Sequence, residues 1–281
     1  MNFKDYHVHL EQGPYTIEWI KKFVEEGEKR RVVEIGFSEH GHRFIQAVNL
    51  WGSHGFRGKW TGSEATKDID EYIEIVQKAK SMGLPVKLGI EMDYIPEHED
   101  EIWEFVAKYP FDYVLGAVHW LGDFGFDHPA LRDEWNKRNI DLTYREYFDV
   151  LLKAIKSRIF DCIAHPDVIK VFGHRAKADL KDIYDEVARA LKDAGICAEV
   201  STAGLRKPVG EMYPSPAMME CFKKYNVPVV INSDAHRPED VGRDFDKALD
   251  FVKSYGYGKC AEFQNGKFRR GTGIYALTVD S

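Results

Sequence analysis

Residues 5–13 read DYHVHLEQG, and this stretch bears directly on the choice between two folds. In a nucleotide-binding sheet the first strand runs into a glycine-rich loop, whereas here the first expected strand runs into His7 and His9. Alternate side chains of a strand point to the same face, so both histidines can reach one ion while Val8 packs on the other side. Two nearby histidines also occur by chance, so the interpretation as a chelating pair depends on what the other strands carry.

The pattern of a short buried strand that ends in polar residues recurs along the chain. Such runs occur at 32–40, 86–94, 113–120, 161–167, 198–204 and 227–236. Apolar residues at three- and four-residue spacing predict helices at 68–83, 144–158 and 180–195. This alternation requires parallel strands with right-handed crossovers, in a closed barrel or an open doubly wound sheet. Because nearly every strand ends in His, Asp or Glu, the barrel is favoured, since its strand ends converge on one site.

The length of 281 residues suits one barrel, and we expect a single domain over residues 1–281. The stretch from Asn49 to Thr66 is rich in glycine, tryptophan and polar residues, and we expect it to form a long loop over the barrel mouth. The net charge of −7 argues against a surface for nucleic acid or an anionic membrane.

Targeting signals and cysteine usage indicate the compartment. The first residues lack the features of a signal peptide, and no apolar stretch approaches the roughly 18 residues that span a bilayer. The four cysteines form no CxxC pair, so we expect buried thiols instead of zinc ligands or disulfides. These features predict a cytoplasmic protein.

Histidines and carboxylates at the other strand ends strengthen the metal interpretation. They are His40, Glu91, His119, His165, Asp234 and His236. A buried cluster of such groups is costly unless the groups are paired or bound to metal. Imidazole and carboxylate donors without thiolate suit zinc, iron or manganese, and this many groups indicate more than one divalent cation. Glu91 is the natural bridging ligand, because a carboxylate has two oxygens to share.

Basic residues and further histidines lie beside this set. The expected substrate-binding residues are His42 and Arg43, His174 and Arg175 (the two GHR triplets), Arg206, Lys207 and Arg237. Arginine binds phosphate oxygens in a bidentate manner, so an anionic substrate is expected, with Arg175 and Arg206 as the strongest candidates. Solvated surface is the alternative for each arginine. Ordinary surface or loop roles are expected for His54, His98 and His128.

Seven motifs together resemble the PHP (polymerase and histidinol phosphatase) superfamily, and within it the histidinol-phosphate phosphatases. They are DYHVH, FSEHG, GIEMDY, FDYVLGAVHWLG, IAHPDVIKVFGHR, STAGLRKPVGEMYPSPAMM and NSDAHRPEDVG, which span residues 5–242. The resemblance implies an α/β fold, a distorted (β/α)7 TIM-like barrel, with a centre of two or three divalent metal ions.

The resemblance also implies a set of ligands for each ion. One metal would be held by His7, His9, Glu91 and Asp234, a second by Glu91, His119 and His165, and a third by His40 and His236. Relatives supply another ligand, commonly a histidine, a few residues after the HxH pair, and this chain has none there. We hypothesise that Glu11, two residues beyond His9, replaces that histidine.

The implied activity is metal-dependent hydrolysis of L-histidinol phosphate, a small phosphorylated metabolite of histidine biosynthesis, with Glu91, Asp234 and His236 as the catalytic residues. A proton for the leaving alcohol would come from His236, from His42 or from a water molecule, and the imidazole of the substrate would stack on an aromatic residue such as Trp120. Two alternatives stay open. The chain could act on another small phosphate ester, or be a metal-binding regulatory domain impaired in catalysis. The sequence leaves protein partners undetermined.

Overall fold

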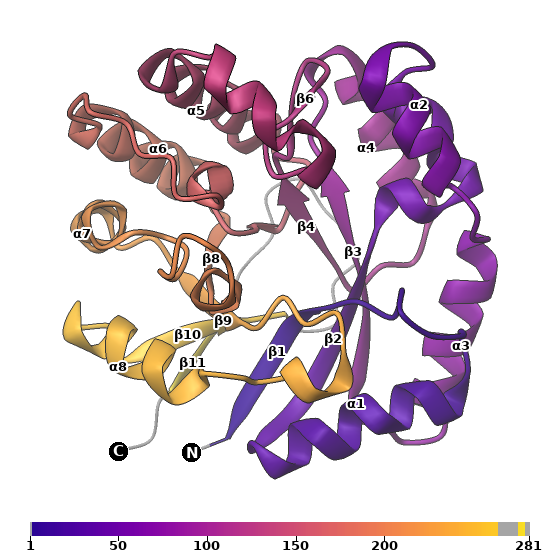
Figure 1. Cartoon of the computed structure of the whole chain (residues 1–281). Coiled ribbons are helices and arrows are strands. Elements are labelled where there is room, and N and C mark those ends of the chain that lie inside the picture. The colour runs from indigo at the N-terminus through magenta and orange to yellow at the C-terminus, as the bar shows by residue number, and fades with distance from the viewer. Residues whose placement is uncertain (1, 264–274, 279–281) are drawn as a thin grey trace.

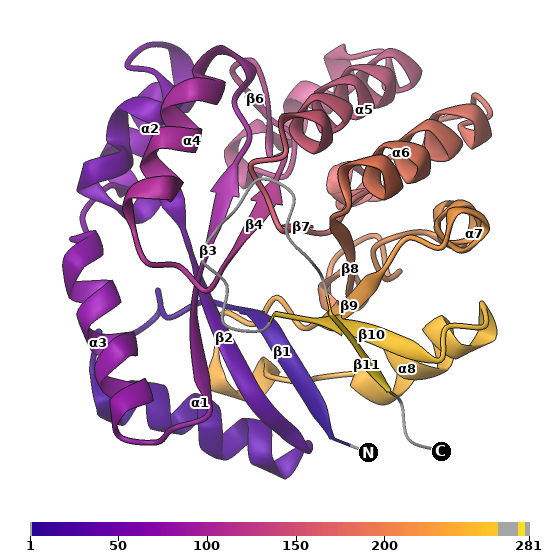
Figure 2. The same cartoon turned by 180° about the vertical axis from the view of Figure 1, so that it is seen from behind.

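Seven parallel strands lie at the centre of the computed structural model, which describes residues 2–263 and 275–278. In spatial order they are β1 (Phe3–Val8), β2 (Val32–His40), β3 (Val86–Asp93), β4 (Tyr113–Ala117), β7 (Cys162–Ile163), β8 (Cys197–Ser201) and β9 (Val229–Asn232). Each strand pairs in parallel with its neighbour. The strands are surrounded by α1 (Ile17–Lys29), α2 (Gly55–Glu64), α3 (Ile69–Ser81), α4 (Glu99–Lys108), α5 (Ile140–Ser157), α6 (Lys181–Ala194), α7 (Pro216–Tyr225) and α8 (Phe245–Ser254) (Figures 1 and 2).

The chain returns to its first strand after β9 and nearly closes the sheet. Val8 pairs in parallel with Ala235. The backbone N–H of His9 donates to the Ala235 carbonyl oxygen at 2.8 Å, and the Ala235 N–H donates to the His7 carbonyl oxygen at 3.1 Å. These contacts confirm the expected distorted barrel over the open doubly wound sheet. They also bring the residues that follow β9 against the two histidines of the first strand.

Most elements lie where hydrophobic periodicity predicts them. Strand β2 coincides with the expected run, and α3, α5 and α6 begin and end within four residues of the expected helices. The stretch 161–167 contains only the two-residue strand β7, because the backbone leaves the extended region at His165, whose φ is 25°. Helix α6 ends at Gly195, which has a φ of 72° and is thus the left-handed glycine that often closes a helix.

The expectation of a long loop between Asn49 and Thr66 is wrong, because this segment contains helix α2. Glycine disfavours helix in isolation, and tertiary packing overrides that preference here. A Cβ at Gly58 would lie only 2.6 Å from the Gly52 carbonyl oxygen, so the close approach requires glycine. Trp51, 1% exposed, anchors the start of the segment in the core.

Aromatic rings fill the barrel below the strand ends. The ring of Tyr113 stacks on Phe263 with centroids 4.6 Å apart, and Tyr6 packs against both. Tyr113 passes over the neighbouring strands only because they carry glycine: a Cβ at Gly36 or Gly89 would collide with its ring. The barrel interior is thus a packed core, as is usual in such barrels, whose functional sites lie at the carboxyl ends of the strands.

Two antiparallel hairpins complete the described chain. They are β5 (Trp120–Leu121) with β6 (Phe124–Gly125), and β10 (Lys259–Glu262) with β11 (Tyr275–Thr278). Three of the four cysteines are buried as expected, whereas Cys260 is partly exposed. In residues 2–263 and 275–278, no helix has the length and apolar character needed to cross a membrane.

Candidate metal centre

The carboxyl ends of the barrel strands bring eight of the nine expected ligands together. His7 lies in β1 and His9 just after it, His40 ends β2, Glu91 lies in β3, His119 and His165 follow β4 and β7, and Asp234 and His236 follow β9. Parallel strands in a barrel direct these ends to one mouth, which explains why residues far apart in sequence meet there.

Four overlapping groups have ligand atoms within 4.8 Å of one another. The groups are His7, His9 and Glu91; His7, His165 and Asp234; Glu91, His119 and His165; and His9, His40 and His236. Glu91 lies among them. Its Oε1 is 3.0 Å from His165 Nε2 and its Oε2 is 2.6 Å from His40 Nδ1, so its two oxygens face different histidines. This geometry suits a carboxylate that is shared between two cations.

Buried nitrogen atoms without partners test whether the cluster fits a metal. His7 Nε2 and both ring nitrogens of His9 are buried and have no hydrogen bond of normal geometry to the described residues. A buried polar atom left unpaired is costly. Nitrogen atoms that point at carboxylate oxygens across 3.4 to 3.6 Å, as between His9 or His7 and Asp234, fit ligands of a divalent cation.

Outer carboxylates hold the ring nitrogens that face away from the cluster. Glu199 Oε1 lies 2.8 Å from His7 Nδ1, and Asp93 Oδ1 lies 2.7 Å from His119 Nδ1. In metal sites such partners fix the tautomer and orientation of the ligating imidazole. Neither residue is among the site residues predicted from the sequence. The signal for Glu199 was a glutamate inside the otherwise apolar strand β8, and the signal for Asp93 was a second acid two residues after Glu91.

Glu11 makes the same kind of contact. Its Oε1 lies 2.7 Å from His236 Nδ1, while His236 Nε2 faces Asp234 Oδ1 at 3.3 Å. Glu11 therefore contacts the Nδ1 of His236 in the same way as Asp93 contacts the Nδ1 of His119. Its place beside the third group is where the hypothesis put it, whereas its role as a ligand stays a prediction.

The charges of the cluster shift its pKa values in opposite directions. Burial alone would raise the pKa of Glu91, but His7, His40 and His165 hold it well below its usual value. Burial opposes protonation of His119, yet Asp93 and Asp127 raise its pKa to about 10. The pKa of His236 is likewise raised to about 10, against burial, by Asp234 and Glu11. In the metal-free cluster, His119 and His236 thus carry protons beside ionised carboxylates.

Two of the candidate ligands have unusual backbones. His165 and Asp234 have φ values of 25° and 52°, a region that residues other than glycine rarely adopt. Such positions cost about 1–3 kcal/mol each and persist only where the surroundings hold them. For His165 the holding contact is its backbone N–H, which donates to Glu199 Oε2 at 2.7 Å.

Two of the expected substrate-binding residues line a cavity of about 280 Å³ beside the cluster. They are His42 and Arg43, and the cavity is also bordered by His40 and His119. Arg43 Nη1 pairs with Glu64 Oε2 at 2.8 Å. Burial and the nearby His40 lower the pKa of His42 to about 3, so this imidazole is neutral at physiological pH.

Three further basic residues follow β8 and β9. Arg206 Nη2 donates at 2.6 Å to the carbonyl oxygen of Ser233, the residue before Asp234. Arg237, next to His236, donates from Nε to Gln12 Oε1 at 2.8 Å. Lys207 is exposed. Arg206 is thus held against the backbone next to the candidate ligand Asp234.

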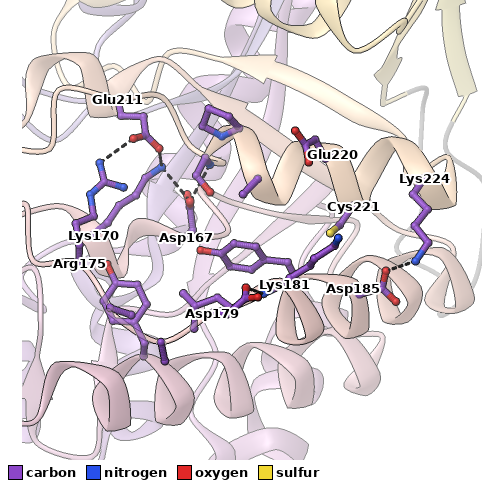
Figure 3. Close-up of a pocket in the computed structure, with 18 residues that line it drawn as sticks. Asp167, Lys170, Arg175, Asp179, Lys181, Asp185, Glu211, Glu220, Cys221 and Lys224 are labelled. Carbon is purple, nitrogen blue, oxygen red and sulfur yellow. Dashed lines mark hydrogen bonds and ion pairs between the residues drawn. The ribbon is translucent and has the colours of Figure 1, made fainter.

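Arg175 and His174 lie elsewhere. Arg175 borders a second cavity of about 670 Å³, between the loops that follow β7 and β8 and helices α6 and α7 (Figure 3). Its Nη2 pairs with Glu211 Oε2 at 2.7 Å, and the same carboxylate accepts from Lys170 Nζ at 2.6 Å. His174 stacks on Trp135 with centroids 4.6 Å apart. Neither residue lines the smaller cavity, and their role in substrate binding stays a prediction.

Comparisons with known proteins agree with this geometry. The family model described as "PHP domain" matches residues 5–203. A probable histidinol-phosphatase of Deinococcus radiodurans is 34% identical over 207 residues, which cover 72% of this chain and 78% of the relative. The histidinol-phosphatase of Bacillus subtilis is 24% identical over 275 residues, which cover 89% of this chain and 99% of the relative.

Among solved structures, the chain is similar to the histidinol phosphate phosphatase of Lactococcus lactis, which was crystallised with zinc, L-histidinol and phosphate. The TM-score is 0.74 at 22% identity, and the match covers 94% of this chain and 97% of that chain. At this identity the likeness supports the barrel fold.

Proposed function

The chain belongs to the PHP-domain family, and from that premise we propose that it hydrolyses L-histidinol phosphate to L-histidinol and inorganic phosphate. One observation carries the proposal: Glu91 is buried at the barrel mouth, and its two carboxylate oxygens contact different histidines, His40 and His165. The relatives named histidinol-phosphatase support the choice of substrate. We further propose that residues 1–281 form one phosphoesterase domain that works in the cytoplasm, as a step of histidine biosynthesis.

The candidate ligands would hold two or three divalent cations of zinc, iron or manganese. They are His7, His9, Glu91 and Asp234 for one ion, Glu91, His119 and His165 for a second, and His40 and His236, with Glu11 beside them, for a third. When bound, the cations supply a water of lowered pKa and offset the negative charge of the phosphoryl oxygens.

The chain's own residues position the ester, and their charges limit which group can protonate the leaving alcohol. Arg206, held next to Asp234, provides positive charge for the phosphoryl oxygens, while Arg43 lies at the cavity wall in an ion pair with Glu64. Of the two histidines considered as proton donors, His42 is excluded by its lowered pKa. His236 would hold the third ion through one ring nitrogen while the other contacts Glu11, so it has no proton to give, and we assign the proton of the leaving alcohol to a water molecule.

A panel of phosphate esters tests the proposal. Metal-loaded protein is assayed for phosphate release from L-histidinol phosphate, phosphoethanolamine, phenyl phosphate and glycerol phosphate, with His119→Ala as the inactive control. We expect kcat/KM for L-histidinol phosphate to exceed the others by about a hundredfold or more. Equal rates across the panel would indicate a broad phosphoesterase. No release from any ester would support a regulatory domain that binds metal without turnover.

A further inference from the structure

The cavity of about 280 Å³ lies beside the candidate metal centre, and one side of it is lined by residues that are not candidate metal ligands. Its near side consists of the candidate ligands His40 and His119, with Glu11. Its far side is built by Trp60, Glu64, Trp120, Asp127 and His128, from helix α2 and the β5–β6 hairpin with the turn that follows it. An ester whose phosphoryl group lies at the cations would extend its alcohol part into this space.

Aromatic rings form most of the far wall. Trp60 lies 4.9 Å from His128 and 5.6 Å from Trp120, centroid to centroid, and 4.9 Å from the neutral His42 on the near side. Trp60 is only partly buried, so part of its surface is open to a ligand. Aromatic faces attract cations as well as other rings.

The two acids of the wall differ in their partners. Glu64 is neutralised by Arg43 at 2.8 Å. Asp127 has no Lys, Arg or His nitrogen within 4.0 Å, and its carboxylate accepts no hydrogen bond from the described part of the chain, although it is half-buried. A carboxylate left unpaired beside aromatic faces is a site for a cationic group of a ligand.

We propose that this cavity is the specificity subsite for an alcohol that carries both a cation and an aromatic ring, with Asp127 pairing to the cation and Trp60 packing on the ring. The inference rests on the proposed function and deepens it, because the histidinol part of the ester carries an ammonium group and an imidazole. Trp120, which is 4% exposed, backs the wall from the core.

A competing role for Asp127 must be separated from this one. Its charge also raises the pKa of His119, a candidate ligand, so a variant could act through the metals. An effect through His119 would change the turnover of every ester alike. An effect through the subsite would change the ratio between a cationic ester and one without charge on its alcohol.

The experiment compares Asp127→Asn and Trp60→Ala with the wild type on the four esters. For Asp127→Asn we expect the ratio of kcat/KM for L-histidinol phosphate to that for glycerol phosphate to fall about tenfold or more. For Trp60→Ala we expect the same ratio and the ratio of phenyl phosphate to glycerol phosphate both to fall. Asp133→Asn, which neutralises an exposed acid of the neighbouring segment, is the matched control and should leave the ratios unchanged. Asp127→Glu should restore part of the loss.

Binding of the product gives a readout independent of turnover. Calorimetric titration of zinc-loaded protein with L-histidinol should show weaker binding to Asp127→Asn than to wild type or to Asp133→Asn. Unchanged ratios and unchanged L-histidinol binding in Asp127→Asn, with wild-type preference for L-histidinol phosphate intact, would overturn the subsite and leave the proposed function standing. Loss of the preference in the wild type itself would instead remove the proposed function.

Discussion

Replacing Glu91 by glutamine is expected to lower phosphate release from L-histidinol phosphate by about a thousandfold or more. The amide keeps the size of the side chain but removes the charge that faces His165 and His40. A neutral amide cannot serve two cations as a shared carboxylate does. We therefore expect the metal content, measured by elemental analysis, to fall together with the activity.

Glu11→Gln is expected to lower the metal content less than Glu91→Gln does. Glu11 contacts His236 at the edge of the cluster, so its loss should affect only the third ion and leave the sites around Glu91 occupied. If Glu11→Gln retains every ion and full turnover, Glu11 does not replace the histidine of the relatives. If Glu91→Gln retains its metals and more than a tenth of the activity, the shared-carboxylate assignment is wrong.

Removing the metal ions with a chelator is expected to abolish phosphate release completely. Without cations, the ester would meet the bare carboxylates of Glu91 and Asp234, which repel a phosphate group. Zinc, manganese or iron(II) should each restore activity to some degree, and the order among them ranks the ions by the activity that they support. Full activity in chelator-treated protein shown to be free of metal would contradict the proposed chemistry.

The pH dependence of reloading follows from the raised pKa values. In the metal-free site the pKa values of His119 and His236 are about 10, above their ordinary value, so both carry a proton at pH 7. A cation binds neutral imidazole and must displace these protons. Zinc affinity should therefore rise between pH 6 and 9, by about tenfold per unit for each proton released, as measured by competition with a calibrated chelator.

The same protonation affects the metal-free fold. A histidine whose pKa is raised on folding stabilises the protein below its unfolded pKa, and this contribution is lost as the pH rises through about 10. As the pH rises from about 6.5 to about 10, metal-free protein should therefore unfold at a lower denaturant concentration. Zinc-loaded protein should lose less stability over the same pH range.

The barrel was predictable because two sequence signals agree. Strand-like runs alternate with segments of helical periodicity, and the runs end in residues that can ligate a metal, such as His40 and His165. The spacing of His7 and His9 in one strand allows a chelating pair, and the histidines and carboxylates at the other strand ends make that interpretation a prediction. Glu91 was predictable for the same reason, because it lies at the end of an apolar run.

Contacts between distant elements were not predictable. Glu199 and Asp93 look like isolated acids in sequence, and only the barrel shows that they hold His7 and His119. Helix α2 was not predicted because its glycines disfavour helix locally. The helix forms because Gly58 packs closely against the backbone of Gly52. The sequence could not separate Arg206, which is bonded beside Asp234, from Arg175, which is paired with Glu211 in another cavity.

The origin of the oxygen transferred to phosphorus tests the central claim most directly. Metal-loaded protein is incubated with L-histidinol phosphate in ¹⁸O-labelled water, and both products are identified by mass spectrometry. Attack of water on phosphorus predicts unlabelled L-histidinol and inorganic phosphate that carries a single ¹⁸O atom. Label in the alcohol, or no formation of L-histidinol by protein with its metals in place, would contradict the account.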